Sequence, residues 1–270
     1  MLIDINAYVG HWPFMQRRYN TCEALLGRMN EFGVNISVIS SLNGLFYKNT
    51  QSANEELYDE LRSDKRFGDR FIPFAVINPI YAGWRDDLEV CVKKMGMKGV
   101  RLYPKYHDYE ITDPALVECV KRVRDHGLPV AFKIRMVDSR ARSWMDIPYV
   151  VGKANPKKEW TLMNIVPIVK AVPDAKYMIL NVANGIMLRG DELELFKKAD
   201  ILFDTAGRQV NSLPDLLKTY GKEKFAFGTH SPFLDYLTGM LRIEALRESE
   251  ADLETKELLR SGNAKRILGL

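Results

Sequence analysis

Three side chains of this 270-residue chain are candidate catalytic groups: His230, Lys133 and Tyr8. The unperturbed pKa of an imidazole lies near neutrality, so His230 is suited to act as a general base. The charge of Lys133 can stabilise a developing oxyanion, and Tyr8 can donate a proton or a hydrogen bond. A lysine whose pKa is lowered by burial can instead form a Schiff base with a carbonyl compound. A salt bridge, for example to Asp204, is the structural alternative for this lysine.

A second set of polar and aromatic side chains is suited to hold a small acidic substrate. An arginine such as Arg101 can clamp a carboxylate through two hydrogen bonds, and Arg135 and Arg208 add positive charge. Aromatic residues in neighbouring loops suit rings and sugars, although they also suit a protein interface. The predicted substrate-binding residues are Asn6, Arg101, Tyr103, Asn181, His11, Arg135, Trp144 and Asp204.

The elements that must position these residues follow from alternating patterns along the chain. Short apolar runs, typical of strands covered on both faces, alternate with amphipathic stretches of helical spacing. About eight alternations predict an α/β fold, a (β/α)8 TIM barrel, as a single domain over 1–270. The predicted strands are 2–6, 35–40, 71–77, 99–103, 129–134, 177–181, 201–204 and 225–228. An open doubly wound sheet is the alternative, but residues 7–13 lack its glycine-rich phosphate turn.

Most candidate residues follow the predicted strands or end them. In a barrel, these strand ends meet at one mouth, where barrel enzymes place their chemistry. The long segment 136–162 follows the fifth predicted strand, and its length suggests a lid over that mouth. Gly33 and Gly127 are predicted helix ends, and Asp113 before Pro114 predicts a helix start.

Composition excludes several function classes. Hydrophobic residues make up 46% and the net charge is +4, so neither a nucleic-acid footprint nor a membrane span of roughly 18 apolar residues is expected. The N-terminus lacks a signal-peptide pattern, which suggests the cytoplasm. Three widely spaced cysteines predict buried thiols in predicted helices, not a zinc site or disulfides. A homodimer is a further expectation.

Several segments resemble the amidohydrolase-related family of metal-dependent hydrolases. Residues 4–10 read Asp-Ile-Asn-Ala-Tyr-Val-Gly and resemble its D-x-H-x-H-x-G opening, and 127–133 resemble G-L-P-V-x-x-H. Residues 99–104 resemble the fourth strand of the family, and 179–185 resemble the sixth. Residues 227–232 resemble F-G-T-D-x-P, and 262–270 resemble the G-N-A-x-R-L-L-G-L ending. The resemblance implies the barrel fold over essentially the whole chain.

The resemblance also implies a bound divalent cation, often zinc. This chain, however, lacks the residues that bind the cation in the family. In the family, histidines and an aspartate surround the cation, whereas Asn6, Tyr8, Lys133, Asn181 and His230 occupy those positions here. Amide and ammonium groups are poor zinc ligands, and a lysine adds positive charge where the dication would lie. The sequence therefore predicts no metal and no other cofactor.

These observations predict a metal-independent hydrolase or lyase that acts on a lactone, a sugar acid or another small carboxylate. A catalytically inactive ligand-binding or regulatory relative of the family is the alternative, and the residues alone favour neither. A conventional metal-dependent hydrolase and a Schiff-base lysine enzyme are further alternatives.

Overall fold

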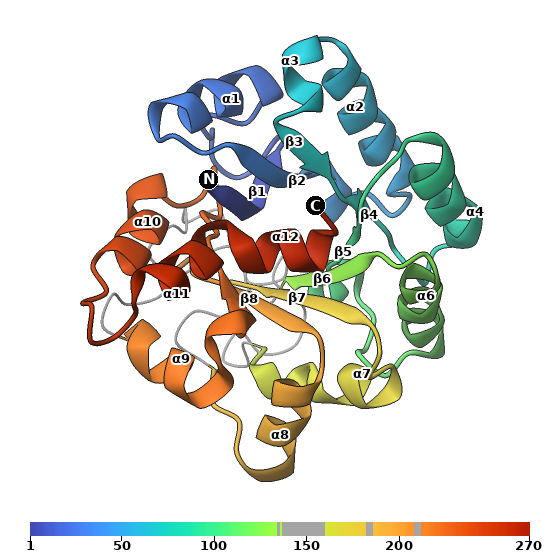
Figure 1. Ribbon diagram of the computed structural model, residues 1–270. Helices are drawn as coiled ribbons and strands as arrows, with labels where there is room; N and C mark the ends of the chain where they lie inside the picture. The colour runs from blue at the N-terminus through green and yellow to red at the C-terminus, as the bar shows by residue number, and fades with distance from the viewer. Residues whose placement is uncertain (134–135, 137–159, 182–185, 208–211) are drawn as a thin grey trace.

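The computed structural model of the protein describes residues 1–133, 136, 160–181, 186–207 and 212–270 (Figure 1). Arg135, Trp144, Arg208 and nearly all of the predicted lid, 136–162, lie outside the described residues.

Parallel strands at the centre of the molecule form a TIM barrel (Figure 1). They are ordered β1-β2-β3 in one sheet and β4-β5-β6-β7-β8-β9 in the other. Phe74 separates β3 from β4, so the nine labelled strands of the described residues fill the eight predicted strand positions. The strands are β1 (Ile3–Val9), β2 (Ile36–Ser41), β3 (Phe71–Pro73), β4 (Ala75–Val76), β5 (Val100–Leu102), β6 (Pro129–Lys133), β7 (Lys176–Leu180), β8 (Ile201–Asp204) and β9 (Phe225–Ala226).

Backbone hydrogen bonds join the two sheets into one ring. The amide of Phe74 donates to the carbonyl of Ile39 over 2.8 Å, which links the break between β3 and β4 to β2. On the other side, the amide of Tyr8 donates to the carbonyl of Ser231 over 2.9 Å. The first strand therefore lies beside the segment that follows the last strand, and residues far apart in sequence meet there.

Helices surround the strands, as Figure 1 shows. They are α1 (Cys22–Glu31), α2 (Gln51–Arg62), α3 (Lys65–Gly68), α4 (Trp84–Glu89), α5 (Pro104–His107), α6 (Pro114–Asp125), α7 (Val166–Ala171), α8 (Gly190–Lys198), α9 (Leu213–Tyr220), α10 (Tyr236–Glu244), α11 (Leu253–Glu257) and α12 (Asn263–Leu268). Helical segments of the 3-10 type are η1 (Asn43–Leu45), η3 (Leu162–Asn164) and η5 (Lys222–Lys224), and those of the π type are η2 (Val90–Lys94) and η6 (Leu258–Gly262).

The predicted helix boundaries are confirmed. The carboxylate of Asp113 accepts a hydrogen bond from the amide of Ala115 over 2.8 Å, as an N-terminal cap does. Gly33 and Gly127 follow α1 and α6 with φ of +66° and +71°, a backbone conformation that disfavours side chains with a Cβ.

A bulge in β1 sets which of its side chains enter the mouth. The register with β2 skips one residue between Asp4 and Ala7. Ile3 and Ile5 therefore pack in the barrel interior, while Ala7 packs in the outer core between strands and helices. Tyr8 belongs to a separate aromatic cluster. Because a bulge re-aims the side chains that follow it, it brings polar residues of β1 to the C-terminal end of the barrel.

The barrel interior is filled in layers. The apolar layer contains side chains such as Val38, Met178 and Leu202, and it extends to Ala264 and Ile267 of α12. Figure 1 shows α12 lying across this end of the barrel, near both chain termini. A second cluster at the other end contains Tyr8, Trp12, Leu42, Leu45, Val76, Tyr103, Met136 and Phe233. The buried polar residues described below lie in these strands and at their C-terminal ends.

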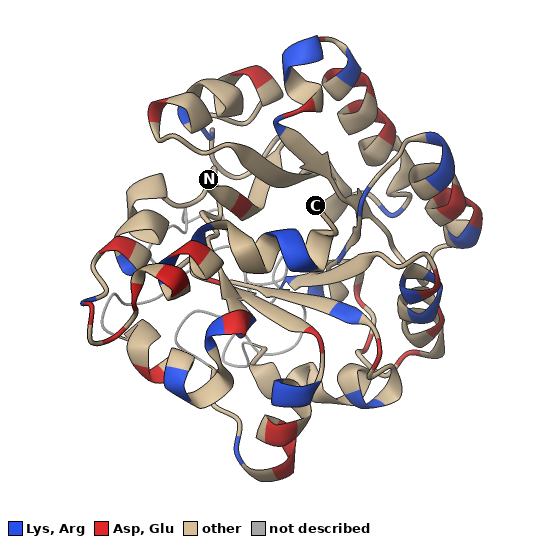
Figure 2. Ribbon diagram, viewed as in Figure 1, with Lys and Arg blue, Asp and Glu red and all other residues tan. Residues whose placement is uncertain are grey.

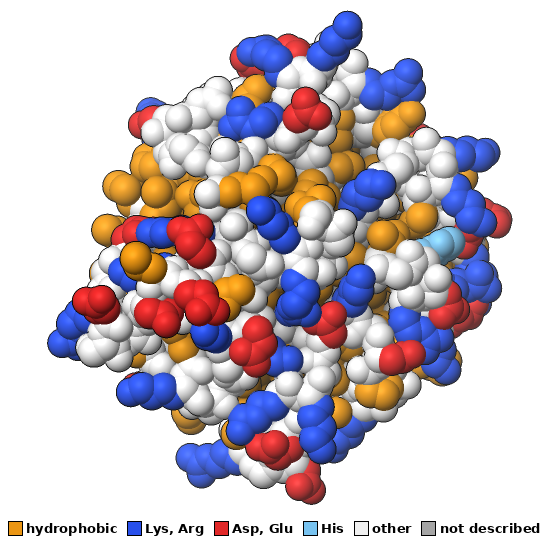
Figure 3. Space-filling model, viewed as in Figure 1, with side chains coloured by type: hydrophobic (Ala, Val, Ile, Leu, Met, Phe, Trp, Pro, Cys, Tyr) orange, Lys and Arg blue, Asp and Glu red, His pale blue; other side chains and the backbone are white. Residues whose placement is uncertain are grey.

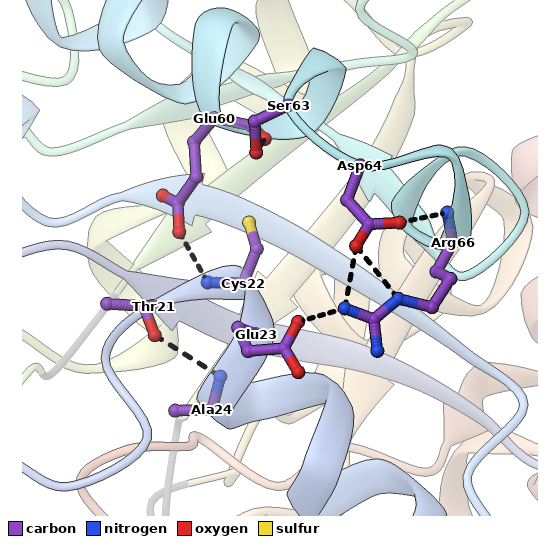
Figure 4. Close-up of polar contacts among 8 residues, drawn as sticks. All are labelled: Thr21, Cys22, Glu23, Ala24, Glu60, Ser63, Asp64 and Arg66. Carbon is purple, nitrogen blue, oxygen red and sulfur yellow. Dashed lines mark hydrogen bonds and ion pairs between the residues drawn. The ribbon is translucent and has the colours of Figure 1, made fainter.

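Polar contacts tie the outer helices together. Thr21 caps α1 by accepting from the amide of Ala24, and Glu60 of α2 accepts from the amide of Cys22 over 2.6 Å (Figure 4). Arg66 of α3 bonds to both Glu23 of α1 and Asp64, as Figure 4 also shows. These contacts fix the first three helices against each other around β1 and β2.

Charges of both signs are interspersed over the outer helices, and the strands carry few (Figure 2). On the face shown in Figure 3, acidic and basic side chains alternate without a large patch of one sign. In the part of the chain that the structure describes, no helix has the length and hydrophobicity needed to cross a bilayer. The cysteines are free and buried in helical segments, as predicted.

Candidate active site

A hydrogen bond between two ionisable side chains forms the centre of the mouth. The Nζ atom of Lys133, the last residue of β6, lies 2.9 Å from Nδ1 of His230, which follows β9. The Nε2 atom of His230 lies 2.5 Å from the carbonyl oxygen of Met136. A carbonyl oxygen only accepts, so Nε2 carries a proton, and in the neutral ring Nδ1 then accepts from Lys133. The backbone thus sets the tautomer of the neutral imidazole.

The other partner of Lys133 is also fixed in direction. The side-chain amide of Asn6 donates to Asp204 Oδ2 over 2.5 Å, so its Oδ1 faces the lysine and accepts from Nζ over 3.4 Å. The opposite carboxylate oxygen of Asp204 accepts from the backbone amide of Asn181 over 2.7 Å. Asn6 thus connects Lys133 to Asp204, which sequence reasoning had considered as a direct ion-pair partner of the lysine.

A glycine makes this connection possible. A Cβ at Gly228 would lie 2.7 Å from Cβ of Asp204 and 3.3 Å from Cβ of Asn6. Real Cβ contacts are not that short, so only glycine lets the strand after β9 approach these two side chains. The glycine of the Phe-Gly-Thr segment therefore has a packing role in the site.

Burial influences the protonation of Lys133 and His230, which together form the central pair of the site. The exposed fractions of Lys133 and His230 are 6% and 1%. Burial lowers the pKa of Lys133 well below its usual 10.5, and Arg101 lowers it further, while Asp204 opposes this. Burial also lowers the pKa of His230 well below its usual 6.5, and the neighbouring lysine adds to the effect. Burial therefore disfavours the charged form of both groups in the folded protein.

Tyr8 lies between the lysine and an arginine. The Nζ atom of Lys133 is 5.3 Å and Cζ of Arg101 is 4.4 Å from the centre of the Tyr8 ring. The ring also meets His230 edge-on, with 5.6 Å between centroids. The Tyr8 hydroxyl is buried next to that of Tyr103, and burial raises its pKa well above the usual 10, which keeps it protonated. It is thus a candidate donor to a ligand.

Arg101 lies deeper in the barrel than the sequence suggests. Its side chain is fully buried, and its terminal nitrogens donate to the carbonyls of Ala7, Val38 and Ile5 over 2.9, 3.0 and 3.4 Å. These contacts hold β1 and β2 together. Its guanidinium also interacts with the hydroxyl of Tyr103. The clamp through both terminal nitrogens is therefore not available in this arrangement, although a role in attracting a carboxylate stays a prediction.

Asp4 is a buried acid that the sequence reasoning missed. Its carboxylate accepts from the hydroxyl of Thr229 over 2.5 Å and from the amides of Thr229 and Asn6. Burial raises its pKa from 3.8 to about 6, and the hydrogen bonds and Arg101 oppose the rise. A charged residue inside an otherwise apolar strand was the available signal. Asp4 links the first and last strands directly beside the central pair.

The remaining predicted residues occupy different depths. Tyr103 is buried, and burial raises its pKa to about 12. His11 is exposed, and its backbone amide donates to the side chain of Asn43. His107 is buried with its Nε2 donating to the carbonyl of Gly44 over 2.8 Å. The structure brings Asn6, Tyr8, Lys133, Asn181, Asp204 and His230 together, whereas His11 lies at the surface.

A family model described as amidohydrolase matches residues 4–270. The chain belongs to the amidohydrolase family. The match spans both the residues of the central pair and the closing segment at 262–270, so the resemblance seen in the sequence is confirmed.

Solved structures with the same fold include enzymes of known reaction. The barrel of this amidohydrolase-family chain superimposes on 2,6-dihydroxybenzoate decarboxylase from Rhizobium with a TM-score of 0.73 and 14% identity, covering 99% of this chain and 98% of the other. A 5-carboxyvanillate decarboxylase from Novosphingobium aromaticivorans gives 0.77 and 13%, with 100% and 96% covered. A 4-oxalomesaconate hydratase from Rhodopseudomonas palustris gives 0.70 and 18%, also with 100% and 96% covered.

The expectation that no cofactor is used is wrong in the light of these structures. The 5-carboxyvanillate decarboxylase was crystallised with manganese, so a divalent cation accompanies this fold. The side chains described here do not fit such an ion as they are arranged. Among them no three His, Cys, Asp or Glu residues converge. In addition, Lys133 occupies the lone pairs of His230 Nδ1 and Asn6 Oδ1 that would face a cation.

Proposed function

We propose that this chain is a lyase that acts on a small carboxylic acid, with decarboxylation as the reaction to test first. The observation that carries the proposal is the buried hydrogen bond from Lys133 Nζ to His230 Nδ1 at the C-terminal end of the barrel. Barrel enzymes place their chemistry at this end, and ionisable groups with strongly shifted pKa values gather at active sites.

The structural relatives support the substrate class. Two are decarboxylases of aromatic carboxylic acids, and one is a hydratase of an oxo acid. All three names describe lyase reactions, in which a bond is broken or formed without net hydrolysis. The permanent positive charge of Arg101 behind Tyr8 favours an anionic substrate in the same place.

Different residues at the mouth of the barrel can perform the separate steps of a decarboxylation. Loss of carbon dioxide leaves an electron pair on carbon, which needs a group that withdraws it and a proton that replaces the carboxylate. The buried hydroxyl of Tyr8, whose raised pKa keeps it protonated, is the candidate donor of that proton. Lys133 and His230 supply a donor and an acceptor whose directions are fixed, and the Asp204–Asn6 contact orients the lysine.

Hydrolysis of a lactone or a sugar acid, which the sequence predicts, is the second candidate because the matching family model is that of amidohydrolases. A hydrolase needs a base with a free lone pair to activate water. Both ring nitrogens of His230 are already hydrogen-bonded. The base that the sequence predicts for hydrolysis is therefore already engaged, and decarboxylation is tested first.

The test is release of carbon dioxide from a panel of small hydroxybenzoic acids and oxo acids. Each reaction is run with added manganese and with a chelator, because a relative holds that metal. At least one acid should be consumed, and Lys133→Met should lower turnover about 100-fold or more. Lys224→Met is the matched control, since Lys224 is equally buried but donates to the carbonyl of Ala199. Binding of acids without consumption of any would contradict the proposal.

A further inference from the structure

Lys133 and Lys224 are two buried lysines with different surroundings. Each is 6% exposed. Lys224 donates to the backbone carbonyl of Ala199 over 2.7 Å, far from the mouth. Lys133 instead has two side-chain acceptors, His230 Nδ1 at 2.9 Å and Asn6 Oδ1 at 3.4 Å. The comparison shows that burial alone does not define the surroundings of Lys133.

Both acceptors of Lys133 are held in place by further hydrogen bonds. In the neutral ring of His230, Nδ1 accepts because Nε2 carries the ring proton and donates to Met136. Oδ1 of Asn6 must accept because the amide nitrogen of that side chain donates to Asp204. A tetrahedral amine nitrogen has one bond to carbon and three further positions. Two of them hold N–H groups directed at these acceptors, which leaves the third position for a lone pair or a proton.

The surroundings favour a lone pair at that third position. The ring of Tyr8 lies 5.3 Å from Nζ of Lys133 and 4.4 Å from the guanidinium of Arg101, which is always charged. A second cation over the same buried ring is unfavourable, since charges repel strongly where water is excluded. The lowered pKa of Lys133 agrees with this geometry. A neutral amine with two fixed N–H groups is a nucleophile.

We infer that Lys133 forms an imine with the carbonyl carbon of a 3-oxo acid, and that this imine withdraws the electrons released on decarboxylation. The inference rests on the proposed lyase function and deepens it by naming the substrate class. It assigns to a side chain the electron-withdrawing role that decarboxylation requires.

The reaction balances without an oxidant or a reductant. The amine adds to the carbonyl carbon, water leaves, and a protonated imine remains. The bond to the carboxylate then breaks, carbon dioxide departs, and the electron pair enters a carbon–carbon double bond conjugated to nitrogen. A proton adds to the carbon, and water hydrolyses the imine to release the ketone and restore Lys133.

The fixed tautomer of His230 supports the protonated imine. After the imine forms, the nitrogen of Lys133 keeps one N–H group, and His230 Nδ1 is held ready to accept from it. This acceptor stabilises the cationic form, which withdraws electrons more strongly than the neutral imine. The His230 side chain is thus a positioning partner of Lys133 as well as a neighbour of the substrate.

The first experiment traps the imine. The protein is incubated with acetoacetate and sodium borohydride, digested, and analysed by mass spectrometry. A reduced adduct is expected on Lys133 and absent from Lys224, and Lys133→Arg should abolish it while keeping N–H donors at the site. Lys224→Arg should leave the adduct unchanged. Equal labelling of many lysines, or labelling that survives Lys133→Arg, would overturn the inference.

A second readout separates the inference from the proposed function. An imine pathway exchanges the ketone oxygen with solvent, so acetoacetate turned over in ¹⁸O-labelled water should give labelled acetone, after correction for spontaneous exchange. Carbon dioxide release from any acid with neither adduct nor exchange beyond that background overturns the imine and keeps the lyase function. An adduct on Lys133 without release from any acid overturns the lyase function and keeps the nucleophilic lysine.

Discussion

Nδ1 of His230 accepts a 2.9 Å hydrogen bond from Lys133 while the opposite nitrogen of the same ring donates to the carbonyl of Met136. The two faces of the imidazole therefore have separate roles, one directed to the lysine and one to the backbone. Because asparagine and glutamine place an amide at different distances from the backbone, the two roles can be tested separately.

His230→Asn should keep more activity than His230→Gln. The asparagine amide lies near the position of Nδ1 and can accept from Lys133, whereas the glutamine amide reaches the position of Nε2 and keeps only the contact with Met136. We expect turnover to fall by about 100-fold or more in the glutamine variant and by less in the asparagine variant.

Steady-state kinetics on an acid that the wild-type protein consumes measures this difference. Asparagine also tolerates the φ of +58° at this position, so thermal unfolding of both variants is the control for folding. Equal loss of activity in two equally stable variants would contradict the separate roles of the ring nitrogens.

Asp204→Asn should destabilise the fold more than removal of a surface carboxylate. One carboxylate accepts from both Asn6 and the amide of Asn181, and an amide cannot replace both contacts in the same geometry. Hydrogen bonds to a buried charge contribute more than neutral ones, so we expect a loss of about 2 kcal/mol in the free energy of unfolding.

The matched control for that variant is Asp200→Asn. Asp200 pairs with Arg266 near the surface, and exposed ion pairs contribute at most about 1 kcal/mol. Urea unfolding of both variants at neutral pH makes the comparison. A loss for Asp204→Asn no larger than that for Asp200→Asn would show that the Asn6–Asp204 contact does not stabilise the mouth.

The sequence predicts the strands well because their apolar runs are continuous. Seven of the eight predicted strand positions match a labelled strand within a few residues, and the third is divided at Phe74 into β3 and β4. The bulge between Asp4 and Ala7 was not predictable, since no residue type marks it. Because of this bulge, the side chains of Asn6 and Tyr8 lie at the mouth, although Ile5 packs in the barrel interior.

The sequence predicts which residues form the candidate site, but it does not predict the hydrogen bonds between them. Strand ends indicate which side chains reach the mouth, but they do not give the depth of each. Arg101 was therefore expected at the surface of the pocket, although backbone carbonyls hold it inside the barrel. The direct contact between Lys133 and His230 depends on the spacing of two strands that are not neighbours, which no local pattern encodes.

Asp4→Asn should gain stability relative to the wild type as pH rises on the acidic side of neutrality. A carboxyl group with a raised pKa adds stability that is complete below its unfolded pKa and is lost as pH rises through the folded value. The window here runs from 3.8 to about 6. At 1.36 kcal/mol per pKa unit, the contribution of the Asp4 carboxyl group to the stability of the wild type should fall by about 3 kcal/mol across it, and the variant should lack this contribution.

Urea unfolding at several pH values tests this linkage. The groups that interact with Asp4 are Thr229, Arg101, Tyr236 and Lys133. The pKa of Tyr236 is raised well above this window, and the lowered pKa of Lys133 has a stability effect of the opposite sign. Thr229→Val is a suitable comparison, because it removes the hydroxyl donor while the carboxyl group remains. Parallel pH profiles for the wild type and Asp4→Asn would contradict the raised pKa.

His107→Gln should act in the opposite direction. Burial lowers the pKa of His107 from 6.5 to about 4, because Nδ1 is buried without an acceptor among the described residues. A base with a lowered pKa adds stability that is complete above its unfolded pKa and is lost as pH falls through the folded value. The wild type should therefore lose about 3 kcal/mol between pH 6.5 and 4 from this group.

The two linkages overlap between pH 4 and 6, where they cancel in the wild type and separate in the variants. The glutamine amide can still donate to the carbonyl of Gly44, so His107→Gln preserves the one hydrogen bond of the imidazole. Its stability should rise relative to the wild type as pH falls, whereas that of Asp4→Asn should rise relative to the wild type as pH increases. If the two variants show the same pH dependence, the buried environment of His107 is not as the structure describes it.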